Sequence, residues 1–354
     1  MVWHASLILR VMRAITISQQ GSPVAPNVAI DNDWNEPTPQ PGEVLVRTEA
    51  SALNHLDLWV GRGLPGIDLT YPRIGGSDGC GIVEAVGEGV DDLWIGRRVV
   101  LNAACPVPEP SHPEIAPARP DIQMIGEHTN GTMAAKFTAP AANVLDVGQT
   151  DPVHAAAFSL THLTAWRMMK SRARVQPGQW VLITGIGGGV ALAALNIARH
   201  LGCRTIVTSR HQAKLDRAKE LGADHAVLDS GEDWSREVRG ITGKRGVDVC
   251  VDSVGKAIHT SCIKALARGG VFVTCGVTSG FDPETDLARI FWNQLSVLGS
   301  TMGDMDEFRE ITALLVSGAL EPVIDTVYSP DQAMQAYERL EAGEQFGKLV
   351  INWS

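Results

Sequence analysis

Between residues 179 and 277, short apolar runs alternate strictly with amphipathic runs, and this alternation constrains the fold more than any other feature. The apolar runs WVLITG, RTIVTSR, DVCVDSVG and VFVTCGV are separated by patterns such as VALAALNIARHLG and HQAKLDRAKELGA. Strands that alternate with helices of this length form a parallel sheet covered by helices. The sequence therefore predicts an α/β fold with a Rossmann domain over residues 153–303, which opens with a helix at 153–174.

The turn after the first of these strands is rich in glycine. Gly185, Gly187, Gly188 and Gly189 follow the apolar VLIT, and Val190 lies in the helix that comes next. Glycine keeps such a turn tight and lets a pyrophosphate reach the free N–H groups and the dipole of the helix N-terminus. A glycine pattern alone is weak evidence, but its place between a strand and a helix favours a dinucleotide site over a turn without a ligand.

The end of the second strand indicates which dinucleotide is bound. NAD enzymes usually carry an acidic residue there, which hydrogen-bonds the ribose 2′-hydroxyl. This chain has Ser209 and Arg210, with Lys214 close by. A serine and a guanidinium can hold a 2′-phosphate through charge-assisted hydrogen bonds, whereas an aspartate would repel it. We therefore predict NADPH as the cofactor; the alternative is that Arg210 is a solvated loop charge.

The first part of the chain has a different character. Over residues 12–152, strand-like runs are broken by glycine and proline, which predicts an all-β, barrel-like domain. Six prolines between positions 106 and 120 predict a surface loop. We expect residues 1–11 to be an N-terminal extension. Residues 304–354 form a C-terminal segment whose last strand, GKLVINW, returns to the first domain.

Composition excludes several classes of function. The formal net charge of −10 argues against nucleic acid as a main partner, because phosphate binding needs a basic face. The N-terminal MVWHASLILRV is too short to span a bilayer and has no cleavage site of a secretion signal. The six cysteines form no CxxC pair, which predicts free thiols in a reducing compartment and a cytoplasmic protein without a membrane partner.

Several motifs together resemble one family. In chain order they are ALNHLDLWVGRGLPG, GGSDGCGIVEAVGEGV, FSLTHLTAW, GIGGGVALAALNIAR, AKELGAD, GVDVCVDSVG and QFGKLVINW. They resemble the medium-chain dehydrogenase/reductase superfamily, and within it the quinone oxidoreductase-like branch, over residues 12–354. The resemblance implies a GroES-like N-terminal β-barrel domain, a Rossmann domain, and an active site in the cleft between them.

The resemblance also locates the positions of a catalytic zinc. Zinc members of the superfamily bind the metal through a cysteine, a histidine and a third ligand, and these positions hold Asn54, Ser77 and Leu160 here. None of the three is a good zinc ligand. A structural zinc would need four close cysteines near residues 100–120, where only Cys105 occurs. We therefore predict no metal; an irregular site of His55, Asp57 and Asp78 is a weaker alternative.

Without zinc, the oxidation of an alcohol loses the Lewis acid that stabilises an alkoxide. A carbon conjugated to a carbonyl accepts hydride more easily, because the charge spreads over an enolate and needs only hydrogen-bond donors and a proton. The resemblance assigns Asn54 to the nicotinamide, with an amide that could also donate to substrate oxygen, and Thr164 to the carboxamide. The alternatives are a turn residue and a helix-packing residue. His55, His128 and His162 are possible proton donors.

The same resemblance places further cofactor contacts on the Rossmann side. They lie where strands end and near the C-terminus, at Ser253, Gly276, Val277, Thr278, Ser300, Thr301 and Lys348.

The sequence thus predicts an NADPH-dependent, zinc-independent reductase of quinones or α,β-unsaturated carbonyl compounds. Two alternatives stay open: an alcohol dehydrogenase with a displaced metal, and a non-catalytic NADPH-binding protein. The apolar FWNQLSVLGSTM reads as an edge strand of the Rossmann sheet, which predicts a homodimer that pairs through residues of about 270–303.

Overall fold

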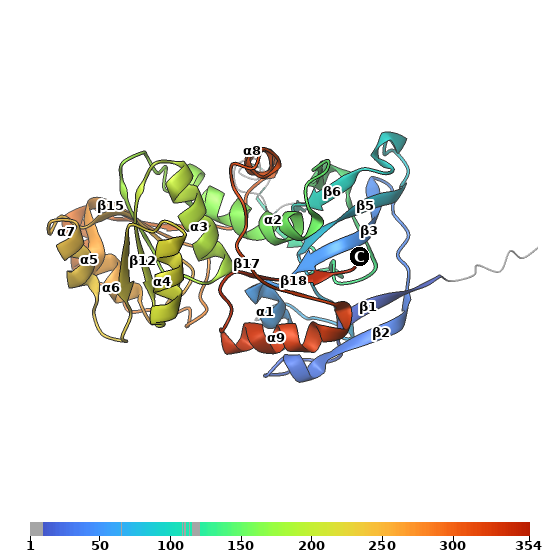
Figure 1. Ribbon diagram of the computed structural model, residues 1–354, viewed down its shortest axis with the longest axis horizontal. Coiled ribbons are helices and arrows are strands. Elements are labelled where there is room, and N and C mark those ends of the chain that lie inside the picture. The colour runs from blue at the N-terminus through green and yellow to red at the C-terminus, as the bar shows by residue number, and fades with distance from the viewer. Residues whose placement is uncertain (1–9, 65, 108, 110, 113, 115–120) are drawn as a thin grey trace, which may run out of the picture. The chain divides into compact units, whose positions relative to one another are not determined.

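The computed structural model describes residues 10–64, 66–107, 109, 111, 112, 114 and 121–354, and these residues form two compact units (Figure 1). The first unit comprises the chain up to Ser159 with Thr326–Glu344 and Leu349–Ser354. The second comprises Leu160–Asp325 and Gln345–Lys348. The predicted extension at 1–11 and most of the proline-rich loop lie outside the described residues, except that Arg10 is described and Val11 already belongs to the first strand.

The first unit is built from antiparallel sheets, as expected for a GroES-like domain. Its main sheet has the order β10-β6-β5-β3-β18-β17, with β9 also paired to β3. The C-terminal strand returns to this sheet as predicted, because β18 pairs with β3 at Val350 and Ala52. The elements are β1 Val11–Ile17, β2 Val28–Asn35, β3 Glu43–Ala52, α1 His55–Arg62, β4 Arg73–Ile74, β5 Asp78–Val86, β6 Arg98–Leu101, β7 Ala104–Pro106, β8 Ile122–Met124, β9 Lys136–Pro140, β10 Val144–Asp146, β17 Ile324–Tyr328, α9 Ala333–Ala342 and β18 Lys348–Asn352.

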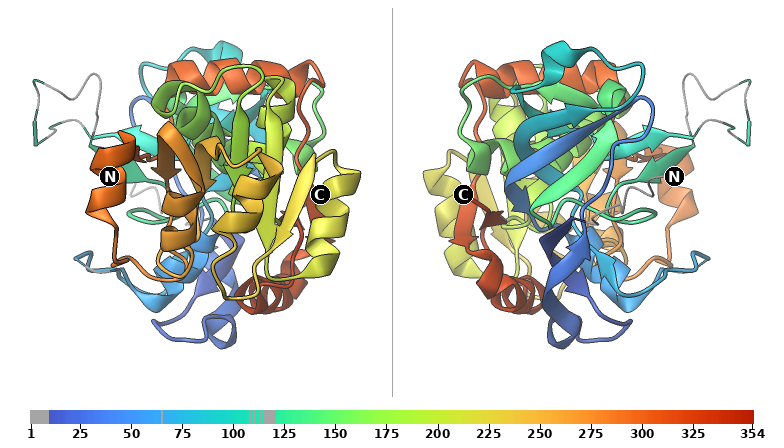
Figure 2. Two further views of the ribbon diagram at one scale, coloured as in Figure 1. Left: turned by 90° about the vertical axis from the view of Figure 1, so that its left-hand side faces the viewer. Right: turned by 90° about the vertical axis from the view of Figure 1, so that its right-hand side faces the viewer.

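The second unit is a parallel six-stranded sheet with the order β13-β12-β11-β14-β15-β16. This is the doubly wound order of a Rossmann fold, in which the strand order reverses beside β11. Helices flank the strands, with α3 packed on β11 and β12 and α4 on β12 and β13 (Figure 2). The elements are β11 Trp180–Ile183, α3 Gly189–His200, β12 Arg204–Ser209, α4 Gln212–Glu220, β13 His225–Leu228, α5 Ser235–Ile241, β14 Val247–Asp252, α6 His259–Ala265, β15 Leu266–Thr274, α7 Leu287–Asn293, β16 Ser296–Gly299 and α8 Met305–Val316.

Local boundaries differ from the sequence prediction at three places. The helix expected at 153–174 is α2, Pro152–Trp166, followed by a π-helical segment at Arg167–Arg172. The apolar run expected as one strand divides, because its first residues end α7 and only Ser296–Gly299 pair with β15. Helix α8 falls inside the second unit, so the C-terminal segment expected at 304–354 returns to the first unit only in its later part; Glu307 on α8 is ion-paired with Arg167 of the second unit.

Each unit has its own apolar core. In the first, side chains such as Ile15, Leu58 and Tyr337 pack together. In the second, Leu182, Ile206 and Phe272 from the sheet pack with residues of α5 and α6. All six cysteines lie in the described part of the chain and all are free, as predicted.

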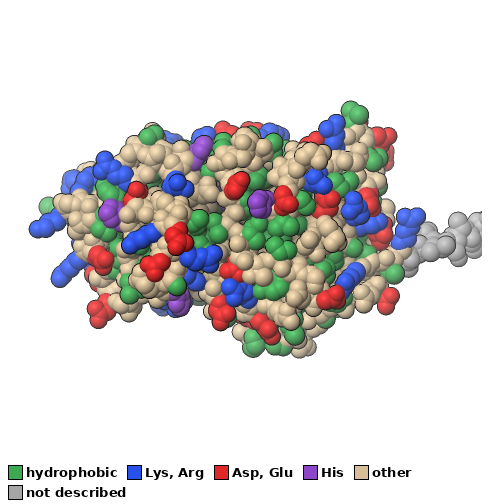
Figure 3. Space-filling model, viewed as in Figure 1, with side chains coloured by type: hydrophobic (Ala, Val, Ile, Leu, Met, Phe, Trp, Pro, Cys, Tyr) green, Lys and Arg blue, Asp and Glu red, His purple; other side chains and the backbone are tan. Residues whose placement is uncertain are grey.

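Within the described ranges, no helix is both long and apolar enough to cross a membrane. On the face drawn in Figure 3, basic and acidic side chains are interspersed rather than gathered by sign.

Candidate functional site: a dinucleotide cradle and a closed turn

The glycine-rich turn joins β11 to α3 at the carboxyl edge of the parallel sheet. Gly185 and Gly187 have φ angles of 64° and 113°, which side chains rarely adopt. A Cβ atom on Gly188 would meet only the carbonyl oxygen of Gly185, at 3.6 Å. Helix α3 starts without a side-chain cap, so its first N–H groups face this open space. The turn has the room and the donors that a pyrophosphate needs.

Two lysines lie beside this turn. A Cβ on Gly187 would be 2.8 Å from Cδ of Lys214, and a Cβ on Gly189 would be 3.1 Å from Cδ of Lys348. The backbone N–H of Gly347 donates to the Gly187 carbonyl at 2.9 Å, which ties the C-terminal segment to the turn. The structure therefore brings together Lys214, Lys348 and the predicted glycines, and it places positive charge where phosphates would lie.

The end of β12 carries the residues predicted to read the ribose. Ser209 is buried and its hydroxyl oxygen accepts from the N–H of His211 at 3.2 Å. Arg210 is exposed, and the Arg217 guanidinium lies 4.1 Å from the ring centroid of the buried Phe346. This edge is basic, which suits a phosphate better than a hydroxyl.

A buried aspartate supports the loops on the other side of β11. Asp252 ends β14, and its carboxylate accepts from the Thr184 hydroxyl at 2.7 Å and from the N–H groups of Val254 and Gly255 at 3.0 Å. Burial raises the pKa of Asp252, and these hydrogen bonds oppose that rise. Asp252 therefore joins β11 to the turn that follows β14.

The turns after β14 and β15 pack against each other. Thr278 donates from its hydroxyl to the Ser253 carbonyl at 3.3 Å, and a Cβ on Gly276 would meet that same oxygen at 2.8 Å. Burial, with Asp252 adding to it, raises the pKa of Cys275 to about 12, so this thiol stays protonated at neutral pH. Val277 is partly exposed beside it, and Ser300 donates its N–H to the Thr274 carbonyl at 2.9 Å. Ser253, Gly276, Val277, Thr278 and Ser300 thus share one edge of the sheet.

Helix α2 lines the same unit through its last two turns. A Cβ on Gly189 would lie 2.8 Å from the methyl group of Thr161. One turn later, the Thr164 hydroxyl donates to the Leu160 carbonyl at 2.7 Å. The hydroxyl hydrogen of Thr164 is therefore used inside the helix, while its oxygen can still accept a hydrogen bond.

In the first unit, the segment GGSDGCG forms a turn that its own neighbours fill. The Asn54 side-chain N–H₂ donates to Asp78 at 3.0 Å and weakly to the Ala52 carbonyl at 3.5 Å. Asp57 accepts from the N–H groups of Asn54 and Gly76, at 2.8 and 2.7 Å. These hydrogen bonds brace the turn through Asp57 and Asp78, and they engage the Asn54 donors as well.

Ser77 is also engaged within this turn. Its hydroxyl donates to the Ile125 carbonyl at 2.7 Å, and the side chain is buried. Burial, with the Asp57 carboxylate adding to it, raises the pKa of the nearby Tyr337 well above its usual value.

Among the residues that the structure describes, no group of three or more His, Cys, Asp or Glu side chains lies close enough together to hold a metal ion. That the protein works without zinc stays a prediction.

Two parts of the chain match described protein families. Residues 40–149 match the family described as "Alcohol dehydrogenase GroES-like domain", and residues 189–317 match "Zinc-binding dehydrogenase". A "Zinc-type alcohol dehydrogenase-like protein YogA" from Leptosphaeria maculans is 30% identical over 90% of this chain and 93% of its own length. The chain belongs to the medium-chain dehydrogenase/reductase superfamily.

Other members of the superfamily differ in their named activities. A "2-haloacrylate reductase" from Burkholderia sp is 31% identical over 89% of this chain and 92% of its own length. A rat "Quinone oxidoreductase" is 25% identical over 97% and 98%. A solved structure titled "NAD-dependent alcohol dehydrogenase" is 37% identical, with a TM-score of 0.89 over 97% of this chain and 100% of that one. The activities named for these proteins therefore differ, and one of the names specifies NAD.

Within this medium-chain dehydrogenase/reductase, the structure also contains polar groups that sequence reasoning missed. Asp252 ends β14, and Thr184 directly follows the adjacent strand β11. The acidic residue at the end of the apolar DVCVD could have indicated from the sequence a buried carboxylate at this edge of the sheet. Glu307 is buried against Arg167, but the two are 140 residues apart, so no local pattern joins them. Of the proposed proton donors, His128 accepts from the Met124 N–H at 3.1 Å, and His162 lies 3.4 Å from the Thr161 hydroxyl.

Proposed function

We propose that the protein is an NADPH-dependent reductase that transfers hydride to α,β-unsaturated carbonyl compounds or quinones without a catalytic zinc. The observation that carries the proposal is the turn around Asn54 and Ser77. Both residues stand at metal-ligand positions of the superfamily, neither supplies a good zinc ligand, and both are buried and bonded to the surrounding chain. An acceptor that is already electrophilic needs no Lewis acid.

The residues of the Rossmann unit fit a dinucleotide. The open turn at Gly188 and the uncapped start of α3 would hold the pyrophosphate, with Lys214 and Lys348 beside it. Ser209 and Arg210 would hold a 2′-phosphate, which favours NADPH over NADH. When bound, the cofactor supplies the hydride.

The chain's own groups would orient the reacting ring. Thr164 would accept a hydrogen bond from the nicotinamide carboxamide, because its hydroxyl hydrogen already bonds to Leu160. The platform of Ser253, Gly276 and Thr278, supported by Asp252, would shape the surface beneath the ring. Named activities of two relatives, 2-haloacrylate reductase and quinone oxidoreductase, support this class of acceptor.

The test is a panel of acceptors with NADPH as donor. We expect oxidation of NADPH with a simple quinone and with an enone, no oxidation with the matching saturated ketone, and no change after treatment with a chelator. Alcohol oxidation that a chelator abolishes would instead establish the displaced-metal dehydrogenase that the zinc-type relatives suggest. Tight nucleotide binding without turnover of any acceptor class would establish the non-catalytic alternative.

We also propose that two copies pair through β16. This strand ends the sheet order, and Phe291, Trp292 and Val297 next to it or on it are 68%, 72% and 49% exposed. An edge strand with apolar neighbours needs a cover. The wild-type protein should sediment as two chains, Val297→Asp as one, and the control Leu93→Asp, at an apolar position that is 72% exposed and lies in the other unit, as two. A wild-type protein that sediments as a single chain at micromolar concentration would reject the dimer.

A further inference from the structure

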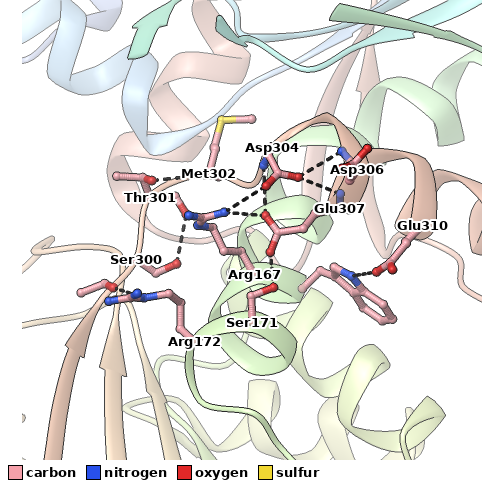
Figure 4. Close-up of polar contacts among 12 residues, drawn as sticks. Arg167, Ser171, Arg172, Ser300, Thr301, Met302, Asp304, Asp306, Glu307 and Glu310 are labelled. Atoms are coloured by element: carbon pink, nitrogen blue, oxygen red, sulfur yellow. Dashed lines mark hydrogen bonds and ion pairs between the residues drawn. The ribbon is translucent and has the colours of Figure 1, made fainter. Parts of the chain in front are cut away.

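The segment Ser300–Gly303, between β16 and α8, is held at both of its ends by the helix that continues α2. Before the segment, Arg172 donates from Nε to the Gly299 carbonyl at 2.9 Å. After it, Arg167 is ion-paired with Asp304 at 3.8 Å and with Glu307 of α8 at 2.6 Å, and the N–H of Asp304 donates to Oε2 of Glu307 at 3.0 Å. Figure 4 shows these residues converging on the segment from the two helices.

Glu307 is the centre of the second anchor. It is 8% exposed, and its carboxylate accepts from Arg167 at 2.6 Å and from the Ser171 hydroxyl. Its own N–H donates to Oδ1 of Asp304 at 3.0 Å, so Asp304 and Glu307 cap α8 reciprocally. A buried carboxylate with several donors fixes its partners in one arrangement, and loss of the charge leaves Arg167 with the longer ion pair to Asp304, at 3.8 Å.

The segment also approaches α2 closely at Gly303. A Cβ on Gly303 would lie 2.5 Å from Cδ1 of Leu163 and 2.7 Å from Oε2 of Glu307. The anchor arises where the helix changes from α to π geometry, at Arg167–Arg172. Such π-helical turns inside longer helices occur frequently at functional sites.

The sheet order shows which half of a dinucleotide would meet this segment. A dinucleotide crosses the carboxyl edge of the sheet at the point where strand order reverses, beside β11. Ser209 and Arg210, which we propose for the adenosine half, end β12 on one side of β11, whereas β14, β15 and β16 lie on the other. Ser300 follows β16 and bonds to the end of β15. The nicotinamide half therefore falls on the side of Ser300–Gly303.

We infer that Glu307 is a positioning residue, which through Asp304, Arg167 and Ser171 holds Ser300–Met302 in place for the nicotinamide half of the cofactor. This inference rests on the proposed function, because it assumes that the Rossmann unit binds a dinucleotide. A helix-docking role alone would not distinguish one half of the ligand from the other. The positioning role predicts that the effect of losing Glu307 depends on whether the ligand has a nicotinamide.

The experiment measures dissociation constants for two ligand pairs: NADPH with 2′-phospho-ADP-ribose, and NADH with ADP-ribose. Glu307→Gln keeps the size of the side chain and removes its charge. We expect it to weaken the preferred dinucleotide by about tenfold and the matching ADP-ribose by less than about twofold, since hydrogen bonds to charged groups are among the strong ones. Arg172→Met removes the other anchor and should act in the same direction, which keeps the test valid if Glu307→Gln does not fold.

Glu310→Gln is the matched control. Glu310 lies one turn further along α8 and also bonds to the α2 side, accepting from Trp166 at 3.0 Å and Lys170 at 2.9 Å, but it has no bond to the segment. It should leave both ligands unchanged. Equal losses for the dinucleotide and its ADP-ribose, or a Glu307→Gln protein that binds like Glu310→Gln, would overturn the positioning role. A wild-type protein that binds neither NADPH nor NADH would instead refute the proposed function.

Discussion

Two glycine-rich turns, Gly75–Gly81 in the first unit and Gly185–Gly189 in the second, use the same residue for opposite purposes. In the first turn, the space of each missing side chain is taken by the protein itself. A Cβ on Gly76 would lie 2.7 Å from the Thr132 hydroxyl, and one on Gly81 would lie 2.0 Å from the Arg47 carbonyl. From the opposite segment, a Cβ on Gly131 would lie 2.2 Å from the carbonyl oxygens of both Gly75 and Gly76.

The second turn is open at Gly188, whereas a Cβ on Gly185 or Gly189 would meet the side chain of Val254 or Thr161, at 2.7 and 2.8 Å. Only the Gly185 carbonyl stands within reach of a Cβ on Gly188, at an ordinary contact distance of 3.6 Å. The closest neighbour of Gly187 is the flexible chain of Lys214. The comparison teaches that glycine allows close self-packing in one turn and close approach of a ligand in the other.

The largest expected effect comes from filling the closed turn. Gly131→Ala places a methyl group against two backbone oxygens that cannot move independently, so we expect a loss of about 3 kcal/mol or more in the free energy of unfolding. The control is Gly240→Ala on α5, where nothing lies within 4 Å of the added atom. That variant should gain about 0.5–1 kcal/mol, because alanine favours a helix. Denaturant titration of both proteins makes the comparison, and a Gly131→Ala protein as stable as wild type would show that the turn is not closed.

The second prediction concerns what enters the open turn. Arg210→Ala should weaken NADPH binding by roughly 1.5–3 kcal/mol, the contribution of a hydrogen bond to a charged group, and hardly change NADH binding. Calorimetric titration of both nucleotides measures this. Equal losses for the two would mean that Arg210 does not read the 2′-phosphate.

The third prediction tests whether the second turn is open at Gly188. Gly188 has a φ of −75°, so alanine fits its backbone, and the added methyl meets no clash in the protein. Gly188→Ala should therefore keep wild-type stability but bind dinucleotide about tenfold more weakly, because the methyl group separates the pyrophosphate from the helix N-terminus. A loss of stability similar to that of Gly131→Ala would erase the difference between the two turns.

Sequence reasoning located the open turn but not the closed contacts. The strand, the glycines and α3 are consecutive, so a local pattern predicts them and, with the repeated alternation, the parallel sheet. Gly131 and Ser77 meet residues about fifty positions away in the chain, and Arg167 meets Glu307 140 residues away. Such contacts depend on tertiary packing, which has no local signature. The resemblance named Asn54 as a nicotinamide contact, and only the structure shows its amide bonded to Asp78.

The smallest expected effect concerns Asp233, which lies outside both turns. Its substitution measures how much a charged surface group contributes to the free energy of unfolding. Although burial raises it, hydrogen bonds from Ser235 and Lys264 lower the pKa of Asp233 to about 2. A lowered pKa stabilises the fold above the pKa of the unfolded chain, near 3.9, and this contribution disappears as pH falls through the folded value. The group is largely exposed, so Asp233→Asn should cost only about 0.5 kcal/mol at pH 6 and nothing near pH 2. Thermal unfolding of the wild type and of Asp233→Asn between pH 2 and pH 6 measures this difference in stability. A larger cost at pH 2 than at pH 6 would contradict the prediction.

The central claim is that the closed turn has no metal while the open turn binds the hydride donor. Elemental analysis of purified protein that is active with NADPH and a quinone or an enone tests it most directly. We predict far less than one zinc per chain at full activity, because Asn54 and Ser77 are bonded within their own turn and are poor ligands. One zinc per chain, whose removal abolishes turnover, would contradict the account.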